Sequence, residues 1–238
     1  MALDINGWID GITATGVVVF GVIFGLFFYF KSKKTGAKLL SYLGLTVMLA
    51  GLMFLGVFSD FLVLLITNQN IENNGFVGIL SYIWFAPVII SAMFIGSELL
   101  TPNRKWYIIS IIVVISVLFE IIMLIDPLNS FNFIPEPPDP PSINLIDYNT
   151  NMFTIAGMLV GVLLLSTLVF LGFGFLYKGF QTTGIIRRNF FYLSAGSIGF
   201  CIFGLLEGLT VPGIMVIFVR IGYLASFWFM YLGLRSKG

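Results

Sequence analysis

Apolar stretches long enough to cross a lipid bilayer follow one another along this chain of 238 residues. A hydrocarbon core of roughly 30 Å requires about 20 helical residues, since each residue of a helix rises about 1.5 Å. Only 10% of the residues are charged and the mean hydropathy is +1.04, whereas a soluble globular domain carries about 25% charged residues. The sequence therefore predicts an all-α integral membrane protein.

The uncharged stretches, read against turn and charge signals, predict seven transmembrane helices in one membrane domain covering residues 1–238, near residues 11–30, 39–65, 76–99, 106–125, 153–177, 189–210 and 213–234. The long connection at 126–152 contains a proline cluster. Because proline disfavours both helix and strand pairing, we expect an extended, water-exposed loop on the extracytoplasmic side. Pro87 lies within the third span and predicts a kink there.

The basic residues predict how the chain is oriented. Eleven of the twelve lie in four short stretches that fall on one side of the membrane once the spans are drawn: Lys31, Lys33, Lys34 and Lys38; Arg104 and Lys105; Lys178, Arg187 and Arg188; Arg235 and Lys237. The positive-inside rule places this side in the cytoplasm. We therefore expect the N-terminus outside and the C-terminus in the cytoplasm of a multi-pass cell-membrane protein. The acidic residues expected outside are Asp4, Asp10, Glu72, Asp126, Glu136, Asp139 and Asp147.

Two further patterns concern helix packing. Spans one and two resemble spans five and six, since each pair reads as an aromatic-rich helix, Lys, a Thr-Gly turn, a basic residue and then Tyr-Leu. The hypothesis is a 3+1+3 pseudo-repeat of parallel halves, and chance similarity of Gly- and Phe-rich helices is the alternative. Three small-xxx-small pairs predict close helix approach, within the chain or between copies: Gly21 and Gly25, Gly157 and Gly161, Gly204 and Gly208.

Arg220 is the one basic residue inside a span. It follows Pro212 by eight residues, which places it roughly 12 Å below the outer surface. A cation at such depth costs about 2.5–3.5 kcal/mol, so we expect it to face the bundle interior with an acidic partner. Glu120 matches its predicted depth better, whereas Glu207 is closer through the short turn between spans six and seven, and a long Arg side chain can snorkel toward it.

A candidate ligand site collects around Arg220 in the outer half of the membrane. It comprises Arg220, Glu120, Glu207, Tyr82, Trp84, Tyr223 and Asp60, of which Asp60 lies at the end of an over-long span. Such a pocket suits a small charged or zwitterionic ligand. The alternative is that Arg220 and one Glu form an ion pair that only fixes helix packing. Arg220→Gln separates the two, by loss of ligand-induced stabilisation or by loss of thermal stability.

Several functional classes are disfavoured. A retinal protein needs a Schiff-base lysine in the seventh span, but the only Lys after Lys178 is Lys237, so we expect no cofactor. The chain has no histidine, no paired aspartate motif and no phosphate-binding loop, which argues against an enzyme and against most metal sites. Nothing predicts nucleic-acid binding.

One segment carries a resemblance to a known family. The sequence SYIWFAPVIISAMFIGSELLTPNRKWYIISIIVVISVLFEIIMLIDP, with its aromatic- and Pro-containing third span, basic turn with Trp and terminal Asp-Pro, is similar to spans three and four of the seven-helix sensor region of prokaryotic histidine kinases. The resemblance covers under a quarter of the chain and implies a receptor or sensor, with no functional residues carried over. Because few residues follow span seven, we expect no output domain.

The leading interpretation is thus a receptor-like or sensor protein, prokaryotic by its resemblance, that signals through a separate cytoplasmic protein. Lys33, Lys34, Arg187 and Arg188 are the candidate contacts with an acidic partner or with anionic membrane lipid. A small transporter of 3+1+3 architecture is the alternative, although neither span one nor span five contains the prolines of such sugar transporters. A non-catalytic subunit of a larger membrane complex is a third.

Overall fold

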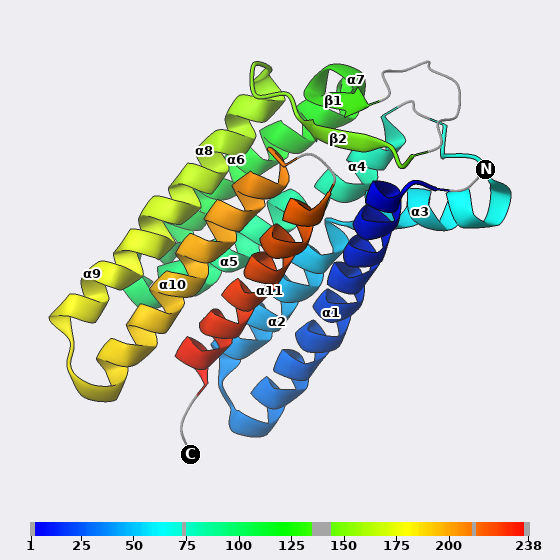
Figure 1. The fold of residues 1–238 in the computed structure, drawn as a ribbon. Coiled ribbons are helices and arrows are strands. Elements are labelled where there is room, and N and C mark those ends of the chain that lie inside the picture. The colour runs from blue at the N-terminus through cyan, green and yellow to red at the C-terminus, as the bar shows by residue number, and fades with distance from the viewer. Residues whose placement is uncertain (1–2, 73–74, 135–143, 211–212, 236–238) are drawn as a thin grey trace.

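The computed structural model is a bundle of long helices with a small cap at one end (Figure 1). It describes residues 3–72, 75–134, 144–210 and 213–235. Within these residues six helical segments are long and apolar enough to cross a membrane, or seven if one bent pair counts as a single span. The all-α, multi-pass membrane class predicted from the sequence is therefore supported by the structure.

Three predicted spans are interrupted by local breaks. The second consists of α2 (Lys38–Leu52) and α3 (Leu55–Thr67), which are bent by 43°. The third consists of α4 (Phe76–Tyr82) and α5 (Phe85–Leu100), and Pro87 follows the break, as its missing N–H and its clash with the preceding turn predict. The fifth consists of α8 (Ile155–Thr167), a π-helical stretch, η2 (Leu168–Phe173), and α9 (Gly174–Gln181).

The remaining spans are continuous helices: α1 (Ile5–Thr35), α6 (Lys105–Ile125), preceded by the short 3-10 turn η1 (Pro102–Arg104), α10 (Gly184–Glu207) and α11 (Ile214–Leu234). Each span packs against the next along the chain, and α11 also packs against α1. The spans therefore form a closed ring. This closure brings the first and last helices together, which matters for the site described below.

Glycines set the closest helix contacts. A Cβ at Gly21 would lie 2.6 Å from the Cα of Gly51, and one at Gly25 would lie 2.7 Å from the carbonyl of Gly44. The first predicted small-residue pair therefore acts within the chain, at the α1–α2 contact. The pair Gly157 and Gly161 lies instead beside Asn151 and Met152 of the preceding loop. The pair Gly204 and Gly208 lines a cavity.

The connection at 126–152 differs from the extended loop predicted for it. A short helix, α7 (Pro127–Ser130), leads into β1 (Phe131–Ile134), which pairs antiparallel with β2 (Asp147–Thr150). Phe131, Phe133 and Ile146 are buried against the helix ends, because their apolar side chains cover the end of the bundle. The proline cluster, with Glu136 and Asp139, lies at 135–143, outside the described residues.

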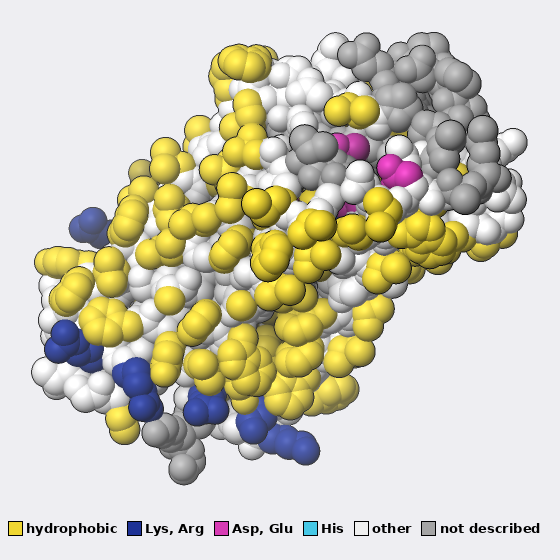
Figure 2. All heavy atoms as spheres, in the orientation of Figure 1, with side chains coloured by type: hydrophobic (Ala, Val, Ile, Leu, Met, Phe, Trp, Pro, Cys, Tyr) yellow, Lys and Arg dark blue, Asp and Glu magenta, His cyan; other side chains and the backbone are white. Residues whose placement is uncertain are grey.

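Charge is segregated between the two ends of the bundle. Figure 2 shows the Lys and Arg side chains gathered at one end and acidic side chains near the other, with an apolar belt between them. Large exposed hydrophobic side chains occur along all the long helices, including Phe30, Tyr107, Phe173 and Phe218. Such a belt is typical of a lipid-facing surface. Lys237, which was expected at the basic end, lies outside the described residues.

Candidate functional site

Arg220 of α11 is buried at the acidic end of the bundle, where it joins three helices. Its Nε and Nη2 donate to Glu207 Oε1 of α10 at 3.0 and 2.7 Å, and Nη2 also donates to Asp10 Oδ1 of α1 at 2.6 Å. Its Nη1 donates to the Asp10 carbonyl at 2.8 Å and to the Thr13 hydroxyl. The guanidinium lies 5.1 Å from the ring centroid of Phe54. All five N–H donors of Arg220 are therefore used inside the protein.

Of the two partners expected for Arg220, Glu207 is confirmed and Glu120 is wrong. The second acidic partner of Arg220 is Asp10, which was expected to lie outside the membrane. The sequence did contain a hint that Asp10 lies within the first helix, because Asp4 is a typical N-cap residue. In the structure Asp4 Oδ1 accepts the Gly7 N–H at 2.7 Å and caps α1. Such a cap starts the helix at residue 5 and places Asp10 inside it. That α1 lies beside α11 is a property of the ring closure, which no local pattern reveals.

A hollow with a cavity volume of about 90 Å³ lies beside this ion cluster. It brings together four of the seven predicted site residues, Tyr82, Glu207, Arg220 and Tyr223. The structure adds Asp10 of α1 together with Asp147 and Tyr148 of β2, which reach it from opposite sides. We call this space the charged hollow. It lies at the acidic end of the molecule, under the β-hairpin that forms the cap (Figure 1).

A second hollow, with a cavity volume of about 60 Å³, adjoins the first. Both are lined by Met53, Tyr82, Gly204, Gly208 and Tyr223, and the second adds apolar walls that include Phe85, Val160 and Phe200. We call it the apolar chamber. A Cβ at Gly204 would meet only Tyr223 at 3.8 Å, and one at Gly208 only a backbone oxygen at 3.7 Å. Gly204 and Gly208 therefore leave open space here. At Gly21 and Gly25, by contrast, an added Cβ would clash with the neighbouring helix.

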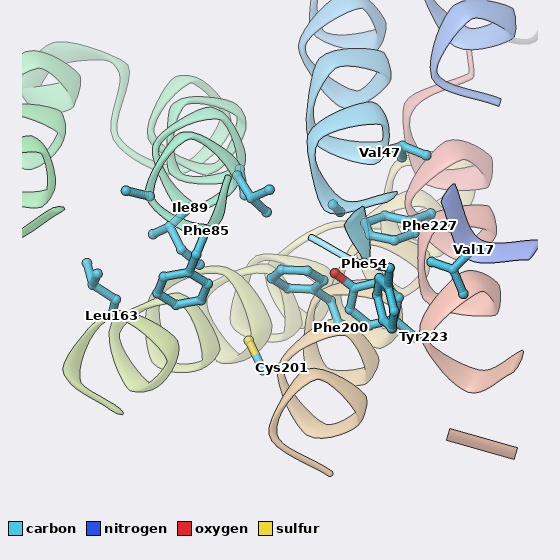
Figure 3. Close-up of a cluster of buried hydrophobic side chains, with 14 of the residues drawn as sticks. Val17, Val47, Phe54, Phe85, Ile89, Leu163, Phe200, Cys201, Tyr223 and Phe227 are labelled. Atoms are coloured by element: carbon cyan, nitrogen blue, oxygen red, sulfur yellow. The ribbon is translucent and has the colours of Figure 1, made fainter. Parts of the chain in front are cut away.

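Aromatic side chains that line the two hollows pack against one another. Figure 3 shows Phe54, Phe200, Tyr223 and Phe227 grouped together, with Phe200 between Tyr223 and Phe85. Tyr223 lies 5.6 Å from Phe200 and 5.2 Å from Phe227 between ring centroids. Phe54, Phe200 and Tyr223 line the hollows, and Phe227 packs against Phe200 and Tyr223 behind them.

Strand β2 supplies the groups of the charged hollow that lie outside the spans. The pKa of Asp147 is raised to about 6, chiefly by burial and also by the negative charge of Asp10, while the Tyr148 backbone and Arg220 oppose the shift. Burial also raises the pKa of Tyr148, although a hydrogen bond with the Ser81 hydroxyl lowers it. The carboxylates of Asp10 and Glu207 raise it too. Both strand residues thus lie in a negative electrostatic environment.

The other three predicted site residues lie elsewhere. Asp60 is fully buried, and its carboxylate accepts hydrogen bonds from Asn70 Nδ2, Ile71 N and Ile146 N at 3.0, 2.8 and 2.9 Å. It therefore ties α3 to the segment before β2. Glu120 faces the backbone of Ala86 in the first turn of α5, and Trp84 lies at the α4–α5 break. Neither contributes to the lining of the charged hollow or the apolar chamber.

The residues predicted to meet a partner or lipid are exposed at the basic end. Lys33 and Lys34 lie in the last turn of α1, and Arg187 and Arg188 in the first turns of α10. Beside them lies a hollow with a cavity volume of about 700 Å³, lined by residues of α2, α5, α6, α10 and α11. Glu98 and Lys105 line it and form a salt bridge at 2.7 Å.

Comparison of the chain with protein-family models, with curated proteins and with solved structures finds no match. Function therefore has to be argued from the site itself.

Proposed function

We propose that this chain is a receptor-like or sensor membrane protein that binds a small ligand in an outward-facing pocket and signals through a cytoplasmic partner. The observation that carries the proposal is the pair of joined hollows beside a buried ion cluster. Ligand pockets combine apolar walls with a few well-placed polar groups, which describes this pair. The pocket and the basic end are lined by different residues, so that a ligand bound here would act on the partner side through the helices.

Three helices are placed to carry such a signal. The pocket is lined by α1, α10 and α11, and the same three helices reach the basic end, where α1 and α10 present the exposed Lys33, Lys34, Arg187 and Arg188. A ligand that changes the packing of α10 against α1 and α11 would therefore move the two basic clusters relative to each other. Basic clusters at this level suit an acidic protein surface or anionic lipid.

The test is a ligand screen with a matched pair of glycine variants. Purified protein in lipid nanodiscs would be screened by thermal shift against small cations, anions, zwitterions and neutral compounds. Gly204→Leu fills the apolar chamber, whereas Gly16→Leu makes the same change at an exposed site with open space around it. We expect at least one compound to stabilise the native protein and Gly16→Leu but not Gly204→Leu. Compounds that stabilise all three alike, or none at all, would contradict the pocket.

The partner half of the proposal has its own experiment. Mild crosslinking in native membranes followed by mass spectrometry should capture a stoichiometric cytoplasmic protein. Its capture should fall when Lys33, Lys34, Arg187 and Arg188 are all replaced by Gln, and should persist in Glu72→Gln, an exposed change at the other end. Capture of other membrane subunits instead would favour a structural component of a complex.

One observation favours transport as a second candidate function. The same helix, α10, lines hollows at both ends of the bundle, with Gly204 and Gly208 at the acidic end and Asn189, Phe190 and Leu193 at the basic end. A compound that binds the outer pocket and accumulates inside proteoliposomes would establish transport, and one that binds without uptake would leave the receptor proposal in place.

A further inference from the structure

We propose that the ligand of this pocket is a small amphipathic organic cation, whose ammonium group lies in the charged hollow and whose apolar body fills the adjoining chamber. This inference rests on the proposed function, because it names the chemical class that the pocket would take. It draws on the charge of the lining, the saturation of Arg220 and the shared walls of the two hollows.

The lining of the charged hollow contains more negative than positive charge. Its ionisable carboxylates are Asp10, Asp147 and Glu207, and its one cation is Arg220. One guanidinium cannot neutralise three carboxylates, and buried charges without a partner are costly. A bound cation would reduce this imbalance, whereas an anion would increase it.

Arg220 has no donor left for an anionic ligand. Its five N–H groups are directed at Asp10, Thr13 and Glu207, and both of its bonds to Glu207 end on Oε1. The second carboxylate oxygen, Glu207 Oε2, is buried and has no hydrogen-bond partner among the described residues. The free polar group at this site is thus an acceptor, which an ammonium N–H group would satisfy.

The aromatic residues of the lining suit the same ligand. Tyr82, Tyr148 and Tyr223 lie around the charged hollow, and the faces of aromatic rings attract organic ammonium groups. A bare metal ion fits less well, since no three His, Cys, Asp or Glu side chains in the described part of the chain are grouped closely enough to hold one.

The apolar chamber indicates what the rest of the ligand should be. It shares Met53, Tyr82, Gly204, Gly208 and Tyr223 with the charged hollow, and its further walls include Phe85, Val160, Leu164 and Phe200. Burying an apolar group against these side chains is favourable by about 25 cal/mol for each Å² removed from water. An ammonium head joined to a ring through a short alkyl linker therefore matches both spaces at once.

The experiment compares three probes that share a phenyl ring and a two-carbon linker. Binding of 2-phenylethylammonium, neutral 2-phenylethanol and anionic 3-phenylpropionate would be measured by calorimetry, with the protein in zwitterionic lipid nanodiscs at pH 7.5. We expect the cation to bind at least about tenfold more tightly than the alcohol, a difference of about 1.4 kcal/mol. Binding of the anion should be the weakest. Tetramethylammonium, which lacks the ring, should bind less tightly than 2-phenylethylammonium.

Two pairs of variants locate the binding. Glu207→Gln should weaken binding of 2-phenylethylammonium and leave binding of 2-phenylethanol unchanged. Glu72→Gln is the matched control, at an exposed site of the same end. Gly204→Leu should weaken the binding of every probe that enters the apolar chamber, and Gly16→Leu is its control. Tighter binding of the anion or alcohol that still depends on Gly204 would overturn the cation inference and leave the pocket intact. Cation binding unchanged in both Glu207→Gln and Gly204→Leu, or no cation binding at all, would overturn the inference outright.

Discussion

Arg220 combines a packing role with an electrostatic one. It joins α1, α10 and α11 through Asp10 and Glu207, and its side chain is only 5% exposed. Its donors are used within the protein, so its direct role is to hold the acidic groups in place around the charged hollow. The ion pair expected for helix packing is therefore present, and the ligand site is our proposal for the hollow beside it.

Replacing Arg220 should destabilise the protein. Arg220→Gln leaves Asp10 and Glu207 as buried carboxylates without a cation, a type of change that costs about 3–5 kcal/mol. We expect a fall in Tm on the order of 10 °C in detergent or nanodiscs. Adding Asp10→Asn should recover part of the loss, because it removes one of the uncompensated charges.

The control is Arg188→Gln, which removes a cation at an exposed position. It should leave the Tm within about one degree, since exposed charges contribute little. If Arg220→Gln were as stable as Arg188→Gln, the ion cluster would have neither role.

Asp147 should make cation binding depend on pH. Burial raises its pKa to about 6, so the folded protein retains a proton there that the unfolded chain has lost. Its contribution to folding stability is therefore largest at low pH and is lost as the pH rises through about 6. A bound cation needs the ionised form. The groups that face Asp147 are Asp10 of α1, Tyr148 of β2, Glu207 of α10 and Arg220 of α11.

The measurement is calorimetry with 2-phenylethylammonium between pH 7.5 and 5. Affinity should fall several-fold as the pH drops through about 6, and Asp147→Asn should bind more weakly at pH 7.5 with a flatter profile. An unchanged profile in Asp147→Asn would remove Asp147 from the site.

At the scale of elements, two features place the site: the breaks in the helices and the close contacts made by glycine. The bend between α2 and α3 puts Phe54 under Arg220, and the break between α4 and α5 puts Tyr82 at the hollow. Pro87 predicted the break between α4 and α5. No proline marks the first, where the sequence showed only an over-long span.

The α1–α2 contact should be sensitive to a single added methyl group. A Cβ at Gly21 would lie 2.6 Å from Gly51 Cα and 3.0 Å from the Val47 carbonyl, and neither backbone atom can move aside cheaply. Overpacking of this kind costs about 1–3 kcal/mol. Gly21→Ala should therefore lower the Tm, as measured by thermal unfolding.

Gly16→Ala on the same helix is the matched control, because nothing lies within 4 Å of the added Cβ. We expect it to be neutral or slightly stabilising, given the higher helix propensity of alanine. Equal losses in the two variants would mean that the close α1–α2 approach does not support the fold.

At the scale of the whole molecule, the basic and acidic ends predict its orientation in the membrane. The acidic end, with the pocket and the cap, should face outside, and the basic end should face the cytoplasm. Cys201 is the single cysteine and is buried, so a Cys201→Ala background allows introduced cysteines to be read individually.

In that background, Glu72→Cys should react with a membrane-impermeant maleimide in intact cells. Lys34→Cys should react only after the membrane is opened. Both positions are exposed, so burial does not confound the comparison. Labelling of Lys34→Cys in intact cells would show the opposite orientation, with the charged hollow on the cytoplasmic side.

Much of this architecture follows from the sequence alone, because the constraints are local. Hydrophobic length determines which segments cross a membrane, Lys and Arg bias their orientation, and Pro87 predicts its own break. A cation at depth must have an acidic partner, and for that reason Glu120 and Glu207 were the partners expected for Arg220. Tyr82 was expected at a similar depth to Arg220, and Tyr223 on the same helical face, three residues further along.

Only the tertiary structure decided which of the acidic residues meet. Asp10 and Arg220 are 210 residues apart and become neighbours because the ring closes α1 onto α11. Asp147 reaches the hollow because the hairpin folds back over the helix ends, while Asp60 and Glu120 are taken up by backbone N–H groups nearby. Depth along a helix is set by counting residues, but which face meets which neighbour depends on the packing of the whole bundle.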